Sequence, residues 1–230
     1  MNWPMRPTRI FALVAAAALS IGAGKPAARN WNTTVAVTPA GTHVLGNPNA
    51  PVKLTEYVSY TCPHCSHFEQ QAESALRVGF VAPGNVSVEV RSYVRDPIDL
   101  AAALLANCGP ASGFFQRHSA FLRSQPRWIE SFGRAGQTER QRWSQGAFGQ
   151  RMRLIASDFG FFDIAASRGV DRAAANRCLA DEAMARKLTA LNEAAEKAGV
   201  EGTPSFMING ELLAGTHEWR TLEPQLRARL

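Results

Sequence analysis

The sequence has no hydrophobic run long enough to cross a membrane, no internal repeat and no low-complexity block. The apolar stretch near its start, from Ile10 to Leu19, is shorter than the roughly 20 residues that a membrane-spanning helix needs. Charged residues make up only 19% of the 230 residues and hydrophobic residues 46%, which argues against a disordered chain. The composition instead suits a globular protein of one domain, with room for an inserted subdomain.

Acidic side chains are missing from the N-terminal region, because none precedes Glu56. Arg6 and Arg9 come before the apolar stretch and small residues follow it, a pattern typical of a secretory signal peptide. We therefore expect residues 1–28 to be an export signal that is cleaved after residue 23 or residue 28. The alternative is an anchor helix that is never removed.

A dense basic run is also missing, although 25 Lys and Arg outnumber 19 Asp and Glu and give a net charge of +6. The basic residues are dispersed among Gln, Ser and Ala, as in TERQRWSQGAFGQRMRL at 138–154. No aromatic stacking motif accompanies them. This pattern is typical of a solvated helical face, and we expect no nucleic-acid partner.

The order of the expected elements indicates an α/β protein. Residues 29–50 are rich in Asn, Thr, Pro and Gly, and we expect an exposed, extended lead-in there. The stretches 52–60 and 86–94 alternate as strands do, and Glu56 falls in the apolar row of the first strand. Helical spacing begins at Cys65, between these two strands. A strand, helix and strand in this order predict a right-handed crossover.

The centre and the end of the chain have different patterns. Residues 97–198 contain mostly helical signals separated by Gly and Pro, which predicts a helical insertion. The end of the chain contains two short apolar stretches joined by Asn209–Gly210, which favours a hairpin with a type I′ turn. A last helical stretch follows Thr216, with Pro224 either in its first turn or at a kink. We therefore expect residues 51–96 and 199–230 to form one domain.

The motif Cys62–Pro63–His64–Cys65 lacks the features of three common cysteine sites. A covalent haem site needs His after the second cysteine, where this chain has Ser66. A zinc site needs a second pair of ligands, and no such pair accompanies the motif at ligand spacing. A disulfide that closes so short a loop would stabilise the fold weakly. A redox-active pair is the remaining interpretation, with no metal and no cofactor expected.

The position of the motif at the start of a helix favours redox chemistry. The free N–H groups and the helix dipole should stabilise a thiolate on Cys62, which makes it the expected nucleophile. Cys65 lies one turn further on, in the apolar row, where burial keeps it a thiol suited to resolving a mixed disulfide. His64 can donate to the thiolate or add positive charge, and Pro63 sets φ at the helix start.

The stretch EYVSYTCPHCSHFE, the long helical insertion and GTPSFMING together resemble the DsbA-like thiol:disulfide oxidoreductases of the thioredoxin superfamily. The resemblance covers most of the chain after residue 50. It implies a thioredoxin fold with a mostly helical inserted subdomain, an exposed attacking sulfur on Cys62, and Glu56 beneath the site as a proton relay. It also implies that Thr203–Pro204 is the cis-proline loop, where Thr203 can pair with an extended substrate.

This resemblance implies a function in the periplasm. The protein would transfer its Cys62–Cys65 disulfide to reduced cysteine pairs of newly exported proteins, through a mixed disulfide on Cys62. A membrane-bound partner would reoxidise it. The alternatives are a disulfide isomerase or reductase with the same site, because Thr replaces the valine of the best-known oxidase at 203, and a peptide-binding chaperone. Residues 29–50 are too short for an oligomerisation region of the isomerase kind, so we expect a monomer.

Two further cysteines, Cys108 and Cys178, remain once the motif is assigned. In an exported chain an even number of cysteines favours pairing, so we expect a structural disulfide between them. Closing a loop of this size is worth roughly 4 kcal/mol in the chain-entropy model. The alternative is two separate buried thiols.

Overall fold

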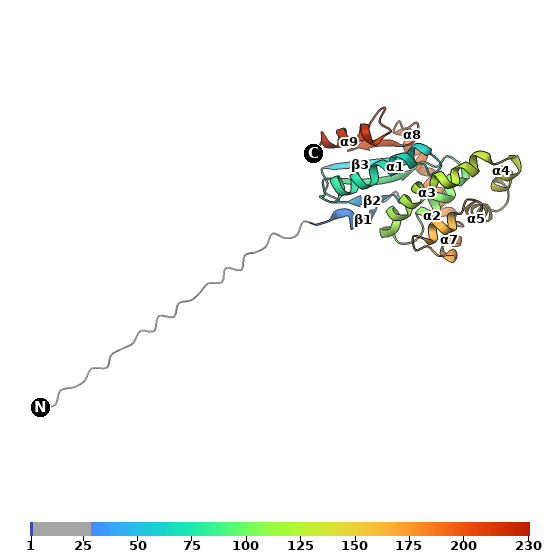
Figure 1. The fold of residues 1–230 in the computed structure, drawn as a ribbon, viewed down its shortest axis with the longest axis horizontal. Coiled ribbons are helices and arrows are strands. Elements are labelled where there is room, and N and C mark those ends of the chain that lie inside the picture. The colour runs from blue at the N-terminus through green and yellow to red at the C-terminus, as the bar shows by residue number, and fades with distance from the viewer. Residues whose placement is uncertain (2–28) are drawn as a thin grey trace.

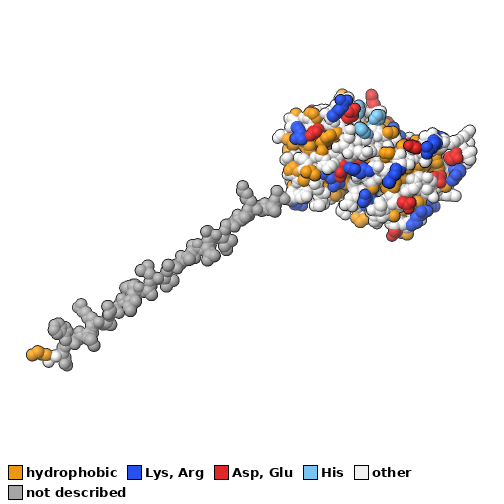
Figure 2. All heavy atoms as spheres, in the orientation of Figure 1, with side chains coloured by type: hydrophobic (Ala, Val, Ile, Leu, Met, Phe, Trp, Pro, Cys, Tyr) orange, Lys and Arg blue, Asp and Glu red, His pale blue; other side chains and the backbone are white. Residues whose placement is uncertain are grey.

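The computed structural model describes Met1 and residues 29–230 of the chain (Figure 1). Apart from Met1, the expected export signal and its cleavage sites lie outside the described residues. In Figure 1 the sheet forms one half of the described part and a group of helices forms the other half. Over the face in view, Lys and Arg side chains are interspersed with Asp and Glu side chains (Figure 2).

A mixed six-stranded sheet with the order β1-β2-β4-β3-β5-β6 forms the centre of the fold. β3 and β4 are parallel, and every other neighbouring pair is antiparallel. The helix α1 (Pro63–Leu76) and the π-helical turn η2 (Arg77–Val81) connect β3 to β4. The strands are β1 (Val35–Val37), β2 (His43–Gly46), β3 (Val52–Val58), β4 (Val86–Ser92), β5 (Ser205–Ile208) and β6 (Glu211–Leu212).

Alternation along β3 sends its side chains to two different cores. Val52, Leu54 and Val58 belong to the large apolar core that includes α1. Tyr57 points to the opposite face and packs with Ala195 in a smaller cluster. Both faces of the central strand are therefore covered, and its carboxyl end leads directly into the CPHC motif.

The helical insertion lies at one end of the sheet (Figure 1). The fold class expected from the resemblance, a thioredoxin fold with a mostly helical insertion, is confirmed. The helices after β4 are α2 (Pro97–Ala106), the short η3 (Ala111–Gly113), α3 (Phe114–Arg134), α4 (Gln137–Ser144), α5 (Phe148–Asp158), α6 (Phe161–Ala166), α7 (Arg172–Cys178) and α8 (Glu182–Lys197).

The segment 29–50 is not the exposed lead-in that its composition indicates. It contains a short 3-10 helix, η1 (Trp31–Thr33), and the strands β1 and β2, and β2 pairs antiparallel with β4. Leu45 of β2 is only 3% exposed. The two strands are too short to show a clear period, and the burial of β2 depends on β4, which begins 40 positions after β2 ends.

Residues 171–199 contain two helices, because the chain turns at Leu179–Asp181 and Asp181 caps α8. α8 then returns to the sheet and covers the face opposite α1. The expected hairpin is present, with positive φ at Asn209 (53°) and Gly210 (87°). The last helix, α9 (Trp219–Arg227), holds Pro224 in its interior, beyond the first turn.

A disulfide joins Cys108, just after α2, to Cys178 at the end of α7. It links two positions that are 70 residues apart in the sequence. Among the described residues, no single helix is long and apolar enough to cross a membrane. α2 and the segment Ala111–Arg134 meet that test only as a pair, with a bend of 118° between them.

Candidate active site

Cys62 is the residue that caps the N-terminus of α1. Its backbone is extended (φ −88°, ψ 115°), and its carbonyl oxygen accepts hydrogen bonds from the N–H groups of Cys65 at 3.1 Å and Ser66 at 3.3 Å. Pro63 occupies the first helical position, where its fixed φ fits and its missing N–H costs nothing. The sulfur of Cys62 therefore lies at the positive end of the helix dipole.

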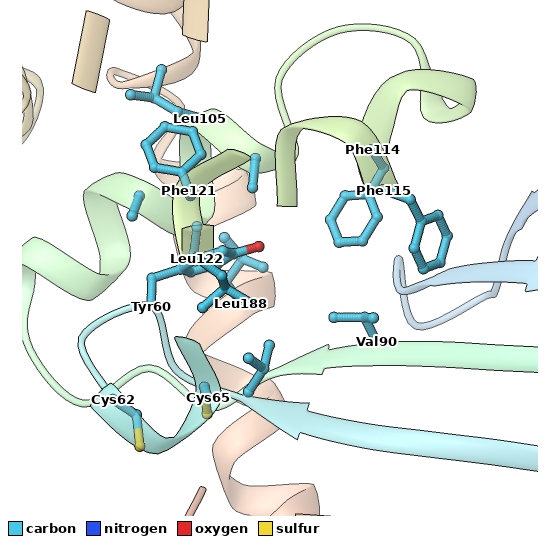
Figure 3. Close-up of a cluster of buried hydrophobic side chains, with 14 of the residues drawn as sticks. Tyr60, Cys62, Cys65, Val90, Leu105, Phe114, Phe115, Phe121, Leu122 and Leu188 are labelled. Carbon is cyan, nitrogen blue, oxygen red and sulfur yellow. The ribbon is translucent and has the colours of Figure 1, made fainter. Parts of the chain in front are cut away.

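The two cysteines of the motif have opposite acidities. A hydrogen bond from the Cys65 thiol is the largest cause that lowers the pKa of Cys62 to about 5, against the effect of burial. Burial raises the pKa of Cys65 well above its usual range. At neutral pH, Cys62 is a thiolate and Cys65 a thiol. In Figure 3 both cysteines belong to the buried apolar cluster, and their two sulfurs point to the same side of the turn.

The Thr203–Pro204 peptide bond is cis and lies beside Cys62. The Cys62 sulfur is 3.1 Å from the carbonyl oxygen of Thr203. On the other side of the loop, the Pro204 carbonyl oxygen and Nδ1 of His217 are 2.7 Å apart. This loop covers the sulfur, so Cys62 is only 3% exposed, whereas the resemblance implies an exposed sulfur. The hydroxyl of Thr203 is buried beside the site and has no hydrogen-bond partner.

Glu56 lies on β3, between Val90 of β4 and Phe206 of β5. It is buried, and its Oε1 has no hydrogen-bond partner. Burial, and next the charge of Glu69, raise the pKa of Glu56 to about 8. The carboxyl is therefore mostly protonated at neutral pH. Its charge, when present, also raises the pKa of Cys65.

His64 lies in the first turn of α1, between the two cysteines. Its side chain is exposed and makes no hydrogen bond within the described part of the chain. The cationic side chain whose charge lowers the pKa of Cys62 is instead Arg95. Arg95 donates from Nε to the hydroxyl of Ser59 at 2.9 Å and from Nη2 to that of Thr61 at 3.3 Å.

Asp99 holds the loop that precedes Cys62. It is 1% exposed, and it accepts hydrogen bonds from the N–H of Tyr60 at 2.7 Å and from the N–H of Arg95 at 3.0 Å. Sequence reasoning missed both Arg95 and Asp99. A usable signal was the parallel pairing of the two strands, because parallel strands end at the same edge of a sheet. The residues after β4 must therefore lie beside those after β3.

The insertion contributes a second support, which the sequence pattern did not indicate. Gln125 of α3 is buried, and its amide nitrogen donates to the carbonyl oxygens of Tyr60 at 2.6 Å and Cys62 at 2.8 Å. Ser66 donates to the carbonyl oxygen of Leu122 at 2.8 Å. α3 thus fixes the first turn of α1. Within residues 29–230, no group of three or more His, Cys, Asp or Glu side chains is arranged to hold a metal ion.

Comparisons with known proteins agree with this geometry. A family model described as thioredoxin matches residues 38–228. The crystal structure of a protein-disulfide isomerase from Novosphingobium aromaticivorans is similar, with 55% sequence identity and a TM-score of 0.78. The match covers 82% of this chain and 97% of that one.

Two named relatives extend the comparison. A Rickettsia typhi protein provisionally named as a protein-disulfide oxidoreductase is 30% identical over 169 residues, which cover 73% of this chain and 54% of the relative. The thiol:disulfide interchange protein DsbA of Bordetella parapertussis is 25% identical over 207 residues, which cover 90% of this chain and 85% of the relative. The chain spans about half the length of the Rickettsia relatives that it matches.

Proposed function

Because the chain belongs to the thioredoxin family and is DsbA-like, we propose that it is a thiol:disulfide oxidoreductase that oxidises reduced cysteine pairs in other proteins. The observation that carries this proposal is the asymmetry of the CPHC pair. A thiolate at Cys62 is stabilised at the helix start, while Cys65 stays a buried thiol. Stabilising the reduced, ionised form makes the disulfide a good oxidant.

The proposed reaction has two exchange steps. A substrate thiolate attacks the Cys62 sulfur, the Cys62–Cys65 bond breaks, and Cys65 takes the electron pair and a proton. A second substrate thiolate then attacks the substrate sulfur of the mixed disulfide, and Cys62 leaves as a thiolate. The substrate loses two electrons and two protons. The CPHC pair gains both electrons and one proton, and the other proton goes to solvent.

Glu56 is the proposed donor of the proton that Cys65 takes. It is mostly protonated at neutral pH, and its charge affects the pKa of Cys65. On the substrate side, an open groove beside the cis-proline loop is lined by Gly202, Ser205 and Leu213, among others. We propose that an extended segment of the substrate lies there and pairs with the backbone of Thr203.

The cellular setting is part of the same proposal. The protein would be exported to the periplasm by its N-terminal segment and would act as a monomer on reduced or unfolded exported proteins. A membrane-bound redox partner would reoxidise the Cys62–Cys65 pair. These statements are supported by the DsbA-like relationship and the basic-apolar pattern of residues 1–28.

Trapping of a mixed disulfide tests the proposal directly. In a Cys65→Ser variant, the Cys62 thiolate should attack a single-cysteine peptide that is supplied as a mixed disulfide with thionitrobenzoate, and thionitrobenzoate leaves with the electron pair. The peptide adduct on Cys62 should accumulate, because Cys65 is not there to resolve it. A Cys62→Ser variant, matched in size and polarity, should form none. Absence of adducts with Cys65→Ser would contradict the assigned roles. If Cys62→Ser still binds unfolded peptides and prevents their aggregation, a chaperone function explains the protein better.

Isomerisation is a second candidate function, favoured by the similarity to a structure described as a protein-disulfide isomerase. An isomerase acts in its reduced form on wrongly paired disulfides, whereas an oxidase must start in its disulfide form. Catalytic amounts of reduced protein should therefore be added to a substrate with scrambled disulfides. Recovery of the native pairing would favour the isomerase. Stoichiometric oxidation of a reduced peptide without such recovery would favour the oxidase.

A further inference from the structure

A pocket of about 480 Å³ lies between α3 and α6, outside the active site. Three arginines line it, Arg123 and Arg127 from α3 and Arg168 from just after α6, and we call it the arginine pocket. Asp163 is the only acidic residue among the described residues of its lining. The larger apolar side chains in the lining are Trp128, Phe159 and Ile164.

The arginines of this pocket lack close carboxylate partners. Exposed arginines elsewhere, on α3, α8 and α9, pair with a glutamate one helical turn away. Arg127 and Arg168 are exposed and form no ion pair or hydrogen bond within residues 29–230. Arg123 lies 3.9 Å from Glu69 and 3.7 Å from Glu73, which is too far for a hydrogen bond. The pocket therefore has an excess of positive charge and free guanidinium donors.

The indole of Trp128 is a second indication of a ligand. Trp128 is only 5% exposed, and its Nε1 is buried without a hydrogen-bond partner. Trp143, which packs against the same Phe159, instead donates from its Nε1 to Asp158 at 2.8 Å. A buried indole N–H usually has such a partner. An acceptor carried by a ligand in the arginine pocket can supply the one that Trp128 lacks.

The chemistry of the pocket fits an acidic segment of a protein that also carries an apolar side chain. Guanidinium groups bind carboxylates through two parallel hydrogen bonds. Arg123 and Arg127 are one helical turn apart on α3, and Arg168 comes from the other wall. A site for a small molecule normally buries most of its ligand. This pocket is partly open to solvent, which suits a chain that passes over it.

The arginine pocket adjoins the active site through α3. The amide nitrogen of Gln125 donates to the carbonyl oxygen of Cys62 at 2.8 Å. Ser124 and Trp128, which line the pocket, each lie within one helical turn of Gln125. The pocket shares no lining residue with the groove beside the cis-proline loop. Since an extended chain advances about 3.3 Å per residue, a short linker can connect a cysteine at Cys62 with a segment in this pocket.

We propose that the arginine pocket is a docking site for an acidic segment of a partner protein, with carboxylates on Arg127 and Arg168 and an apolar side chain against the pocket floor. The binding itself does not depend on the proposed oxidase function, but its effect on the reaction rests on that function. Docking keeps a cysteine of the same partner near Cys62 and so raises its effective concentration there. No covalent bond changes at the pocket.

Binding of a cysteine-free peptide tests the docking site without any measure of activity. A dye-labelled peptide with several Asp and Glu residues around one Phe should bind the full chain, and its Asn and Gln counterpart should bind much more weakly. The double variant Arg127→Gln/Arg168→Gln should lose roughly tenfold in affinity or more, because the charge-assisted hydrogen bonds of two guanidinium groups are gone. Fluorescence anisotropy measures both affinities.

The matched control is Arg177→Gln/Arg229→Gln, which removes the same charge from two exposed arginines outside the pocket. This control should keep the affinity of the wild type. Equal losses in the two double variants would show that the peptide responds only to net charge and would overturn the proposal. Equal affinities of the acidic and the neutral peptide for wild type would overturn it too.

The indole N–H signal of Trp128 shows where the peptide binds. In proton–nitrogen NMR spectra, Trp128→Phe identifies this signal by its loss. The acidic peptide should shift the signal in the wild type, and an unmoved signal in the presence of bound peptide would contradict the proposed location. Inorganic phosphate is the probe for a small anion. If phosphate displaces the peptide at an equal concentration, the pocket is a small-anion site and the proposed partner segment is wrong.

Kinetics test the effect on the reaction. Two dithiol peptides share one cysteine pair and differ only in an acidic or a neutral extension. In the wild type the acidic peptide should have a KM several-fold lower at a similar kcat, and Arg127→Gln/Arg168→Gln should remove this preference. Equal KM values in the wild type would refute the role of the pocket in the reaction. Failure of the wild type to oxidise either peptide would refute the oxidase function instead, so the two failures are distinguishable.

Discussion

The two cysteine pairs of this chain lie at opposite ends of helices. Cys62 caps the N-terminus of α1, where N–H groups and a positive dipole end face the sulfur. Cys108 follows the C-terminal end of α2, and Cys178 is the last residue of α7. At these helix ends the backbone groups without a partner inside the helix are carbonyl oxygens. The Cys108 sulfur lies 3.6 Å from the carbonyl oxygen of Ala174. One pair thus has surroundings that favour a thiolate, and the other has surroundings that disfavour it.

This difference explains how one protein can carry both kinds of pair. A disulfide whose reduced form is stabilised gives up its bond readily, and one whose thiolates are disfavoured does not. The two pairs also differ in loop length, since two residues separate Cys62 from Cys65, whereas Cys108 and Cys178 are 70 positions apart. The short loop contributes little to stability, and the long one constrains the unfolded chain.

The largest effect on stability is expected from the long-range pair. Replacing both Cys108 and Cys178 with Ala should lower the free energy of unfolding by roughly 4 kcal/mol, because the 70-residue loop is no longer closed in the unfolded state. Urea unfolding of the oxidised proteins measures this. The rate of exchange at Cys62 should stay near that of the wild type. A parallel loss of exchange activity in the folded variant would show that the two pairs are not independent.

The next largest effect concerns the pH dependence of the reduced form. The pKa of Cys62 is about 5 in the folded protein and about 8.5 in the unfolded chain. The Cys62 thiolate therefore stabilises the fold fully above pH 8.5, and this stabilisation is lost as the pH falls through 5. Relative to a Cys62→Ser variant, reduced wild type should therefore gain stability as the pH rises from about 5 to about 8.5. Each unit of this pKa difference changes the free energy of unfolding by about 1.4 kcal/mol at most, and screening by solvent beside the loop reduces that change.

The comparison with Cys62→Ser is needed because other buried groups act in the opposite direction. Burial raises the pKa values of Glu56, Glu69 and Asp99, so their contributions are present at low pH and decline as the pH rises through those values. Both proteins contain these groups, so the difference between the two urea midpoints isolates Cys62. A difference that is constant from pH 5 to pH 9 would contradict the assignment of the thiolate to Cys62.

The sequence predicted the local parts of this site better than the parts that depend on packing. Alternation over 52–60 and the Asn209–Gly210 pair identified the strand and the hairpin, because both signals lie within a few residues. The CPHC motif was found for the same reason. Arg95 and Gln125 were missed because their partners, Ser59 and Cys62, lie 36 and 63 residues away. No short pattern in the sequence predicts contacts between residues so far apart.

A smaller effect should follow from Thr203→Val. The Thr203 hydroxyl is buried beside the site without a hydrogen-bond partner, so it can donate to the Cys62 thiolate, which lowers the pKa of Cys62. Valine keeps the shape of the side chain without this hydroxyl. The pKa of Cys62, followed by ultraviolet thiolate absorbance, should therefore rise, and the protein should become a weaker oxidant against glutathione. Thr189→Val, on α8, is a matched control and should leave both values unchanged. An unchanged pKa in Thr203→Val would show that the hydroxyl does not contact the thiolate.

The smallest expected effect concerns Arg95, whose charge is the weakest of the main causes that lower the pKa of Cys62. Its guanidinium is exposed, so Arg95→Gln should raise this pKa by less than the roughly 1–3 units caused by a close, opposite charge. High salt should reduce the difference from wild type, because it screens an exposed charge. Arg134→Gln, an exposed arginine at the end of α3, controls for net charge. If both variants shift the pKa equally, the effect reflects net charge, and the hydrogen bonds that hold Arg95 to Ser59 and Thr61 have no special role at the site.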